Sequence, residues 1–248
     1  HGTRAFRFEQ SMVFSHVSFS YPSTAGAIRD VSLTIPQGSF IGIIGPSGAG
    51  KTTLVDLLLR LNDPLEGAIF VDDIPLNEIA LPDWRRAVGY VPQEIFLINA
   101  TVEENIKFHR PLTDADMMAA ARAAQIHDII EQLPHGYQTN VGERGMHLSM
   151  GQRQRIALAR VLAGKPSVLI LDEATSSLDV ESERLIQQAL MNLRGQVTII
   201  AIAHRLSTIL TSDLLFVMEH GKIIERGDPR HLLADRESHF FQSYQISS

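Results

Sequence analysis

The segment from Gly45 to Thr52 combines glycines, a lysine and a hydroxyl residue at a spacing that could bind phosphate. It reads Gly45-Pro46-Ser47-Gly48-Ala49-Gly50-Lys51-Thr52 and is followed by Thr53. This order fits the pattern G-x-x-x-x-G-K-[ST]. Glycines let the backbone curve around an anion, and the N–H groups of the loop and of a following helix point toward it. Lys51 would bring positive charge to the β- and γ-phosphates and Thr52 an oxygen ligand to Mg²⁺, so the segment predicts a nucleotide-binding loop.

Two acids lie at the end of an apolar run much later in the chain. The residues Val168-Leu169-Ile170-Leu171 precede Asp172 and Glu173. A buried parallel strand that ends in carboxylates places them at the edge of the sheet where ligands of α/β proteins bind. There, Asp172 would help to hold Mg²⁺ and Glu173 would orient and polarise an attacking water. Adjacent acids are also common as plain surface charge, so these roles require that the strand share a sheet with the loop.

The elements around these residues predict an α/β fold. The loop follows the apolar run Phe40–Ile44 and precedes leucines at 54, 57, 58 and 61, the spacing of one helix face. Further strands are expected at 13–19, 28–35, 68–71, 88–91, 168–171, 197–202 and 214–218, with a hairpin turn at 219–222. Residues 101–163 form a helical block that includes a helix over 114–132, and a later helix over 181–193 ends near Gly195. The pattern predicts a parallel-sheet core, an antiparallel edge from the N-terminal strands and a helical lobe.

Composition places the chain among ordinary globular proteins. It has 248 residues, 44% hydrophobic and 20% charged, a net charge of −6 and a sequence pI of about 5.9. This acidic balance gives no general attraction for nucleic acid. The lack of cysteine excludes disulfides, and the longest apolar run, around 197–203, is far shorter than the roughly 20 residues of a membrane helix. The start at His1-Gly2-Thr3, without methionine, predicts that the chain is a fragment of a longer one.

A second candidate site lies in the segment Leu148-Ser149-Met150-Gly151-Gln152. The spacing S-x-x-Q fits a capping box, which by itself indicates only a well-capped helix over 153–163. Followed by the run RQRIALAR, the segment resembles the LSGGQ signature of ATP-binding cassette (ABC) proteins. Met150 stands where the commonest signature has glycine, and we expect it to alter packing near the phosphates without loss of binding.

The resemblance extends over residues 12–228 and implies roles for further residues. Tyr21 would stack on adenine, Gln93 would be a ligand for Mg²⁺ and water, and His204 would contact the γ-phosphate. The other matches are the loop at 45–53 (Walker A), Asp172 (Walker B), Glu173 (the catalytic glutamate) and Ser176-Ser177-Leu178-Asp179 (the D-loop).

The same resemblance implies a P-loop NTPase fold of the RecA-like kind over residues 12–248. The ATPase core with its N-terminal β subdomain would comprise residues 12–96 and 164–228. The helical signature subdomain would comprise residues 97–163, and a C-terminal helix and tail residues 229–248.

The signature also implies a partner. Ser149, Gly151 and Gln152 lie at a helix N-terminus, which attracts anions. The family places this site, with Asp179, against the γ-phosphate of ATP bound to another protomer. A second copy of the domain would therefore pair head to tail around two ATP. Hydrolysis would remove the phosphate that joins the copies and let them separate.

Other segments resemble those of ABC exporters, namely Val141-Gly142-Glu143-Arg144-Gly145 and the residues at 91–97 and 101–106. The resemblance implies that the loop at 141–145 and the Gln93 region contact coupling helices of a transmembrane domain, on the same chain or another. The domain would then lie at the cytoplasmic face of an inner or plasma membrane. One alternative is a soluble ABC ATPase acting on nucleic acid or ribosomes, but the chain has neither a long coiled coil nor a second cassette. The other is a non-hydrolysing sensor, which would be expected to lack Glu173 or His204.

Overall fold

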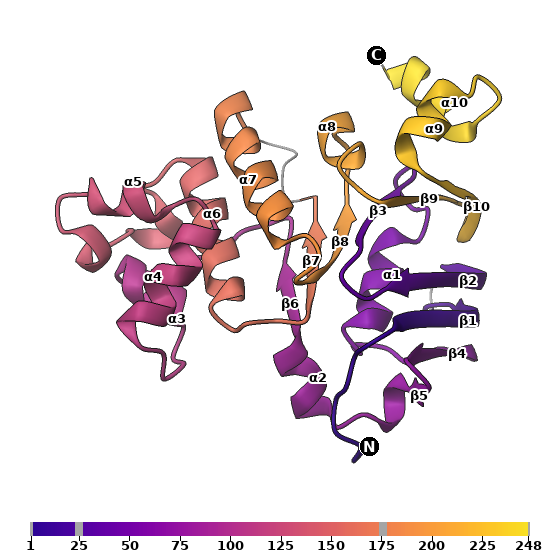
Figure 1. Ribbon diagram of the computed structural model, residues 1–248, viewed down its shortest axis with the longest axis horizontal. Helices are drawn as coiled ribbons and strands as arrows, with labels where there is room; N and C mark the ends of the chain where they lie inside the picture. Colours follow the sequence, from indigo (N-terminus) through magenta and orange to yellow (C-terminus); the bar gives the residue numbers. More distant parts are fainter. Residues whose placement is uncertain (1, 23–26, 174–177, 248) are drawn as a thin grey trace.

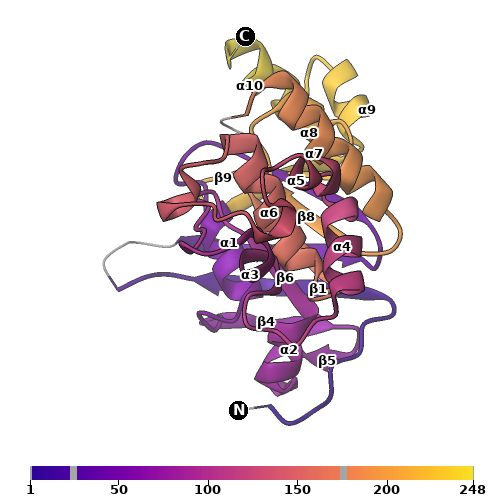
Figure 2. The same ribbon diagram turned by 90° about the vertical axis from the view of Figure 1, so that its left-hand side faces the viewer.

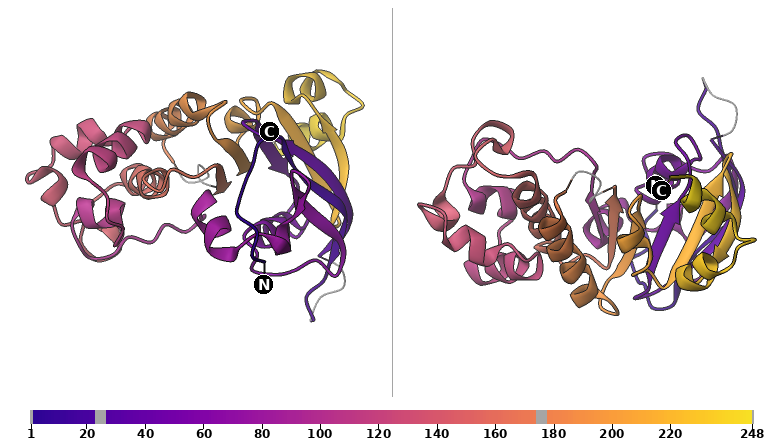
Figure 3. Two further views of the ribbon diagram at one scale, coloured as in Figure 1. Left: turned by 60° about the horizontal axis from the view of Figure 1, so that its bottom comes forward. Right: turned by 90° about the horizontal axis from the view of Figure 1, so that it is seen from above.

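The computed structural model describes residues 2–22, 27–173 and 178–247. Figure 1 shows the β-sheets at one end of the molecule and a block of helices at the other, and both views of Figure 3 show the same separation. The helix α7 (Val180–Leu193) lies between the two parts. The predicted combination of an α/β core with a helical lobe is therefore confirmed.

The larger sheet carries the loop and the acids. Its strands, in spatial order, are β10 (Lys222–Gly227), β9 (Leu214–Glu219), β3 (Phe40–Ile44), β8 (Thr198–Ile202), β7 (Val168–Asp172) and β6 (Val88–Val91). All neighbours are parallel except β9 and β10. Every residue of β3, β7 and β8 is buried, as expected for a parallel sheet covered on both faces. Because these strands run in one direction, the segments that follow them meet at one edge.

The predicted antiparallel edge forms a separate sheet. Its order is β2 (Ile28–Pro36), β1 (Ser11–Phe19), β4 (Glu66–Val71) and β5 (Ile74–Pro75), and all pairs are antiparallel. The helix α1 (Lys51–Leu58) joins the two sheets, because Leu54 and Leu57 belong to the same buried cluster as Val17 of β1 and Ile202 of β8. The next connection contains the turn η1 (Leu76–Glu78) and the helix α2 (Leu81–Ala87).

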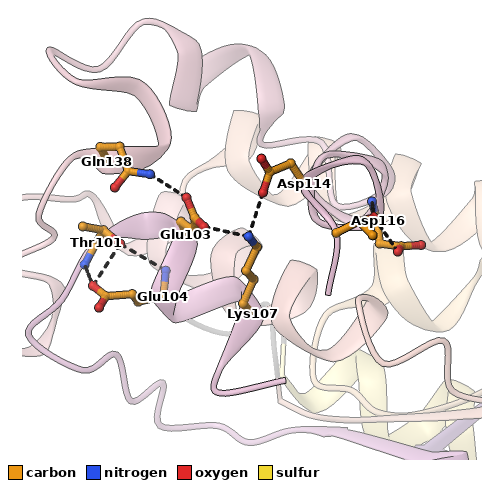
Figure 4. A network of polar contacts seen from close by, with 8 residues as sticks. Thr101, Glu103, Glu104, Lys107, Asp114, Asp116 and Gln138 are labelled. Carbon is orange, nitrogen blue, oxygen red and sulfur yellow. Dashed lines mark hydrogen bonds and ion pairs between the residues drawn. The ribbon is translucent and has the colours of Figure 1, made fainter. Parts of the chain in front are cut away.

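The helical block contains α3 (Val102–Lys107), α4 (Asp114–Ala123), α5 (His127–Glu131), α6 (Met150–Leu162) and the turns η2 (Gly136–Gln138) and η3 (Glu143–Gly145). Seen from this end, α4, α5 and α6 lie together in front of the sheets (Figure 2). A capping box between Thr101 and Glu104 starts α3. Lys107 at the other end of α3 binds Glu103 at 2.6 Å and Asp114 at 2.7 Å, which fixes α3 against α4 (Figure 4).

Two local predictions need correction in this block. The continuous helix over 114–132 is wrong, because α4 ends at Ala123 and Gln125 adopts a left-handed conformation with φ of 57°. Arg155 of α6 donates to the carbonyl of Gln125 at 2.7 Å and stabilises this turn. Helix α6 begins at Met150, three residues earlier than expected, because the Ser149–Gln152 capping box forms its first turn.

The C-terminal part also differs from the prediction of one helix and a tail. Residues 229–247 form two helices, α9 (Pro229–Ala234) and α10 (His239–Ser247), whereas the short helix α8 (Leu206–Ile209) lies earlier, between β8 and β9. The carboxylate of Glu225 accepts bonds from the backbone N–H groups of His239 and Phe240, which starts α10 as a separate helix. Gly195, as expected, follows the end of α7 in a left-handed conformation with φ of 79°. None of the described helices has both the length and the apolar character that a membrane span requires.

Candidate functional site

The backbone between β3 and α1 requires glycine at the positions that the motif predicts. Gly45, Gly48 and Gly50 have φ values of 152°, 78° and 102°. A Cβ atom on Gly45 would lie 2.1 Å from the carbonyl oxygen of Met218, and one on Gly50 would lie 2.5 Å from that of Ala27. Glycine is therefore needed both for the conformation and for the close approach of neighbouring backbone.

Lys51, the first residue of α1, is buried below this loop. Its ammonium donates to the carbonyl of Gly45 at 2.7 Å and to that of Pro46 at 3.0 Å. Burial lowers the pKa of Lys51, although the negative charges of Glu173 and Asp172 act in the opposite direction. The loop thus combines a held cation with the N-terminus of α1, the arrangement that favours a bound anion.

An open cleft of about 500 Å³ brings together residues from distant parts of the sequence. It lies beside the start of α1, and its described lining includes Tyr21, Ser47, Gly48, Gly50, Lys51, Thr52, Thr53, Gln93, Glu173 and His204. The loop, the predicted adenine-side tyrosine and the three predicted catalytic residues therefore share one cavity. Its size and its combination of the Lys51 cation, several hydroxyls and one acid suit a phosphorylated ligand.

Glu173 connects the other two candidate catalytic residues. Its Oε2 accepts a hydrogen bond from the Gln93 amide at 2.7 Å, and its Oε1 lies 2.8 Å from Nε2 of His204. Glu173 directly follows β7 and has φ of 48°, a backbone conformation that is uncommon for residues other than glycine. Its N–H donates to the carbonyl of Ile202 at 3.0 Å, which fixes this turn against β8. A carboxylate held in this way at the mouth of the cleft can orient a water and accept its proton.

Asp172 is buried one residue earlier, at the end of β7. Burial is the largest cause that raises its pKa, whereas a hydrogen bond from Tyr90 at 3.2 Å and the charge of Lys51 lower it. Sequence reasoning did not identify Tyr90, because the pattern of β6 predicts a strand but not which strand lies beside it.

Tyr21 lines the cleft, and two contacts fix its side chain. Its hydroxyl donates to Oδ2 of Asp56 at 2.8 Å, and its ring meets the Phe19 ring edge-on at 5.0 Å. Asp56 lies on α1 and was also missed, because a polar residue within an amphipathic helix gives no signal of its own. The stacking of Tyr21 on adenine remains a prediction.

The signature residues lie elsewhere. The hydroxyl of Ser149 caps the N–H of Gln152 at 3.2 Å, so the predicted capping box is present at the start of α6. Gly151 is buried against α7, and Met150 is exposed, with its sulfur 3.7 Å from the Arg153 guanidinium. None of these described residues lines the cleft of their own chain.

Asp179 caps the next helix. Its carboxylate accepts bonds from the N–H of Ser182 at 2.9 Å and from the hydroxyl of Ser182 at 2.8 Å, and these bonds lower the pKa of Asp179. Asp179 and Leu178 are the described part of the predicted D-loop, and Ser176 and Ser177 lie outside the described residues. Asp179 does not line the cleft either.

The residues proposed for Mg²⁺ fit the ion by their chemistry. Thr52 and Gln93 line the cleft and can offer neutral oxygens, and Asp172 offers a carboxylate next to Glu173. Among the described residues no group of three or more His, Cys, Asp or Glu could hold a metal. A single carboxylate is nevertheless sufficient where the phosphates of a nucleotide complete the coordination, which is the common arrangement for Mg²⁺.

Comparison with known proteins places this geometry in a family. The sequence model described as "ABC transporter" matches residues 28–176, more than half of the chain. The ATP-dependent lipid A-core flippase of Acinetobacter baylyi is 44% identical over 247 residues, which cover 99% of this chain and 43% of that protein. The heavy metal tolerance protein of Schizosaccharomyces pombe is 44% identical over 90% of this chain and 27% of that protein.

A solved structure agrees with the sequence comparisons. A bacterial Atm1-family ABC exporter with ATP bound superposes with a TM-score of 0.91 at 39% identity, over 98% of this chain and 43% of that one. The chain spans less than half the length of these relatives. With the phosphate loop, the Asp172–Glu173 pair and the signature helix in place, the chain belongs to the ABC transporter family.

Proposed function

We propose that the chain is the ATP-binding and ATP-hydrolysing domain of an ABC exporter, which drives export or flipping of a substrate by a transmembrane domain. The observation that carries the proposal is the contact of Glu173 with both Gln93 and His204 at the mouth of the loop cleft. The relatives support the exporter assignment, since they are named as a flippase and an exporter. They do not favour a soluble ATPase that acts on nucleic acid or ribosomes.

Each residue has a definite task in ATP hydrolysis. The loop N–H groups and Lys51 bind the β- and γ-phosphates. To do so, the Lys51 ammonium gives up its hydrogen bonds to the carbonyls of Gly45 and Pro46 and donates to the phosphates. Thr52 and Asp172, with Gln93, would hold Mg²⁺, which neutralises charge on the phosphates when bound. Glu173 orients water for in-line attack and accepts its proton, and His204 supports the γ-phosphate through the ring that now contacts Glu173.

A second copy of the domain completes the site in this proposal. The helix N-terminus at Ser149 does not line the cleft of its own chain, so a phosphate bound there would come from another chain. Head-to-tail pairing of two copies would bring α6 of each against ATP in the other. Asp179, close to Gly151 through Ser182, would lie at the same interface.

This chain exposes apolar side chains that the proposed transmembrane domain could cover. Large apolar side chains are exposed at Phe96, which is 61% exposed, at Met146, which is 69% exposed, and at Phe108. Phe96 lies three residues after Gln93, and Met146 follows the loop at 141–145. A transmembrane domain that covers these side chains would attach the chain to the cytoplasmic face of a membrane.

Replacement of Glu173 by glutamine tests the catalytic assignment. Glu173→Gln keeps the shape and the contact with His204 but loses the base, so we expect ATP hydrolysis to fall by about 10²–10⁴. The dissociation constant for ATP should remain close to that of the wild type. Glu181→Gln is the matched control, because Glu181 is an exposed acid that pairs with Arg184. Wild-type turnover in Glu173→Gln would refute the role.

The same variant tests the pairing. Light scattering after gel filtration should detect a dimer of Glu173→Gln with ATP and Mg²⁺ and a monomer without nucleotide. A monomer that demonstrably holds ATP under both conditions would contradict pairing by the isolated chain.

A further inference from the structure

Tyr90 lies on the face of the sheet that leads directly to Asp172. In the parallel pair of β6 and β7, Tyr90 is the register partner of Ile170. Side chains alternate along a strand, so Tyr90, Ile170 and Asp172 point to the same face. This is the α1 face, since Ile170 and the packed Tyr90 ring belong to the same apolar cluster as Leu54 of α1.

The Tyr90 hydroxyl extends along this face to the carboxylate. It donates to Oδ2 of Asp172 at 3.2 Å. A carboxylate has two oxygens with about four acceptor positions, so one donor can fix its rotation and leave capacity for a cation.

The surroundings of Asp172 show why a neutral donor matters. Asp172 is buried, and its Oδ2 accepts a hydrogen bond from the Tyr90 hydroxyl. Unlike lysine or arginine, a tyrosine hydroxyl adds no positive charge that would compete with a bound cation.

We propose that Tyr90 is a positioning residue that holds the Asp172 carboxylate in the orientation required to bind Mg²⁺. This inference rests on the proposed function, in which Asp172 is a ligand of the ion. Tyr90 itself does not line the loop cleft. Loss of its hydroxyl should weaken metal binding and leave the phosphate loop intact.

Tyr90→Phe tests the inference, with Tyr137→Phe as the matched control. Tyr137 is also half-buried, and it belongs to the helical block, far in sequence from the residues that line the cleft. Its hydroxyl lies 2.8 Å from Nδ1 of His127. Each variant loses one hydrogen-bonded hydroxyl and keeps its ring. The probes are Mn²⁺, measured by electron paramagnetic resonance, and the non-hydrolysable analogue AMP-PNP.

We expect Mn²⁺ to bind the AMP-PNP complex of Tyr90→Phe about 10-fold more weakly than that of the wild type. This is the lower end of the loss of metal affinity that follows substitution of a residue hydrogen-bonded to a metal ligand. AMP-PNP affinity in EDTA should not change. Raised Mg²⁺ should restore ATP hydrolysis in Tyr90→Phe, which a purely structural defect would not allow. Tyr137→Phe should match the wild type in all three measurements.

Two results would overturn the inference. The first is wild-type Mn²⁺ affinity in Tyr90→Phe, and the second is an equal loss in Tyr137→Phe. Failure of the wild type itself to bind AMP-PNP with Mn²⁺ would instead overturn the proposed function, and with it this inference.

Discussion

Replacement of Gly151 by alanine should destabilise the chain through a contact between two helices. Gly151 is buried in the first turn of α6, and a Cβ atom there would lie 2.0 Å from Oγ and 2.5 Å from Cβ of Ser182 on α7. Ser182 has little freedom to move away, because its hydroxyl binds Asp179 at 2.8 Å and its N–H is capped by the same residue. Either α6 must shift or that cap must break.

The magnitude follows from two opposing effects. Forcing an extra methyl group into a packed interface costs about 1–3 kcal/mol, and contacts as short as these belong at the upper end. Alanine is a better helix former than glycine by up to about 1 kcal/mol. We therefore expect Gly151→Ala to lower the free energy of unfolding by about 2 kcal/mol.

Urea denaturation with a second substitution isolates the contact. Ser182→Gly removes both clashing atoms, so Gly151→Ala should cost much less in that background, with an interaction energy of about 1–2 kcal/mol in the double-mutant cycle. An equal cost in both backgrounds would refute the reasoning. So would a loss below about 0.5 kcal/mol in the single variant, the range of ordinary surface substitutions.

Two further predictions concern other parts of the chain. Tyr21→Ala should weaken ATP binding by about 1–3 kcal/mol if the ring stacks on adenine. Tyr21→Phe loses only the bond to Asp56 and should keep most of the affinity for ATP. Calorimetry with ATP and with bare triphosphate checks this, and an equal loss of affinity for both ligands in Tyr21→Ala would exclude stacking. Bonds from the Thr101 N–H and hydroxyl lower the pKa of Glu104 below its ordinary 4.5. The stabilisation is present above pH 4.5 and is lost as the pH falls through the lowered pKa. Glu104→Gln should therefore be less stable than the wild type at pH 7 and approach its stability in acid. A difference in the free energy of unfolding that does not change with pH, measured by urea denaturation, would contradict this.

The elements that carry the cleft could be predicted because their signals are local. The loop at 45–52 sits between an apolar strand and an amphipathic helix, and Asp172 follows an apolar run. The location of Gln93, Glu173 and His204 at one edge also follows from the sequence once their strands are assigned to one parallel sheet, since each comes after a strand of that sheet. Their contacts depend in addition on the order of the strands.

What could not be predicted depends on long-range contacts. The break between α4 and α5 at Gln125 is held by Arg155, which lies 30 residues further along the chain, and no local pattern reveals that bond. The bond from Tyr90 to Asp172 depends on β6 lying beside β7, which periodicity does not specify. The composition of 114–132, rich in Ala and Met, favours helix, but it does not reveal the break between α4 and α5.

The packing of α7 bears on how the active site can be completed. Gly151 is buried against Ser182, and this contact attaches α6 to α7. The neighbouring Glu183 binds Arg205, the residue after His204, and this ion pair attaches α7 to the core. Figure 1 shows α7 between α6 and α8. Folding α6 over the cleft of its own chain would have to break the first contact if α6 moved alone, or the second if α6 and α7 moved together. A second copy could present its α6 to the cleft with both contacts intact, and this supports pairing between two chains over closure within one.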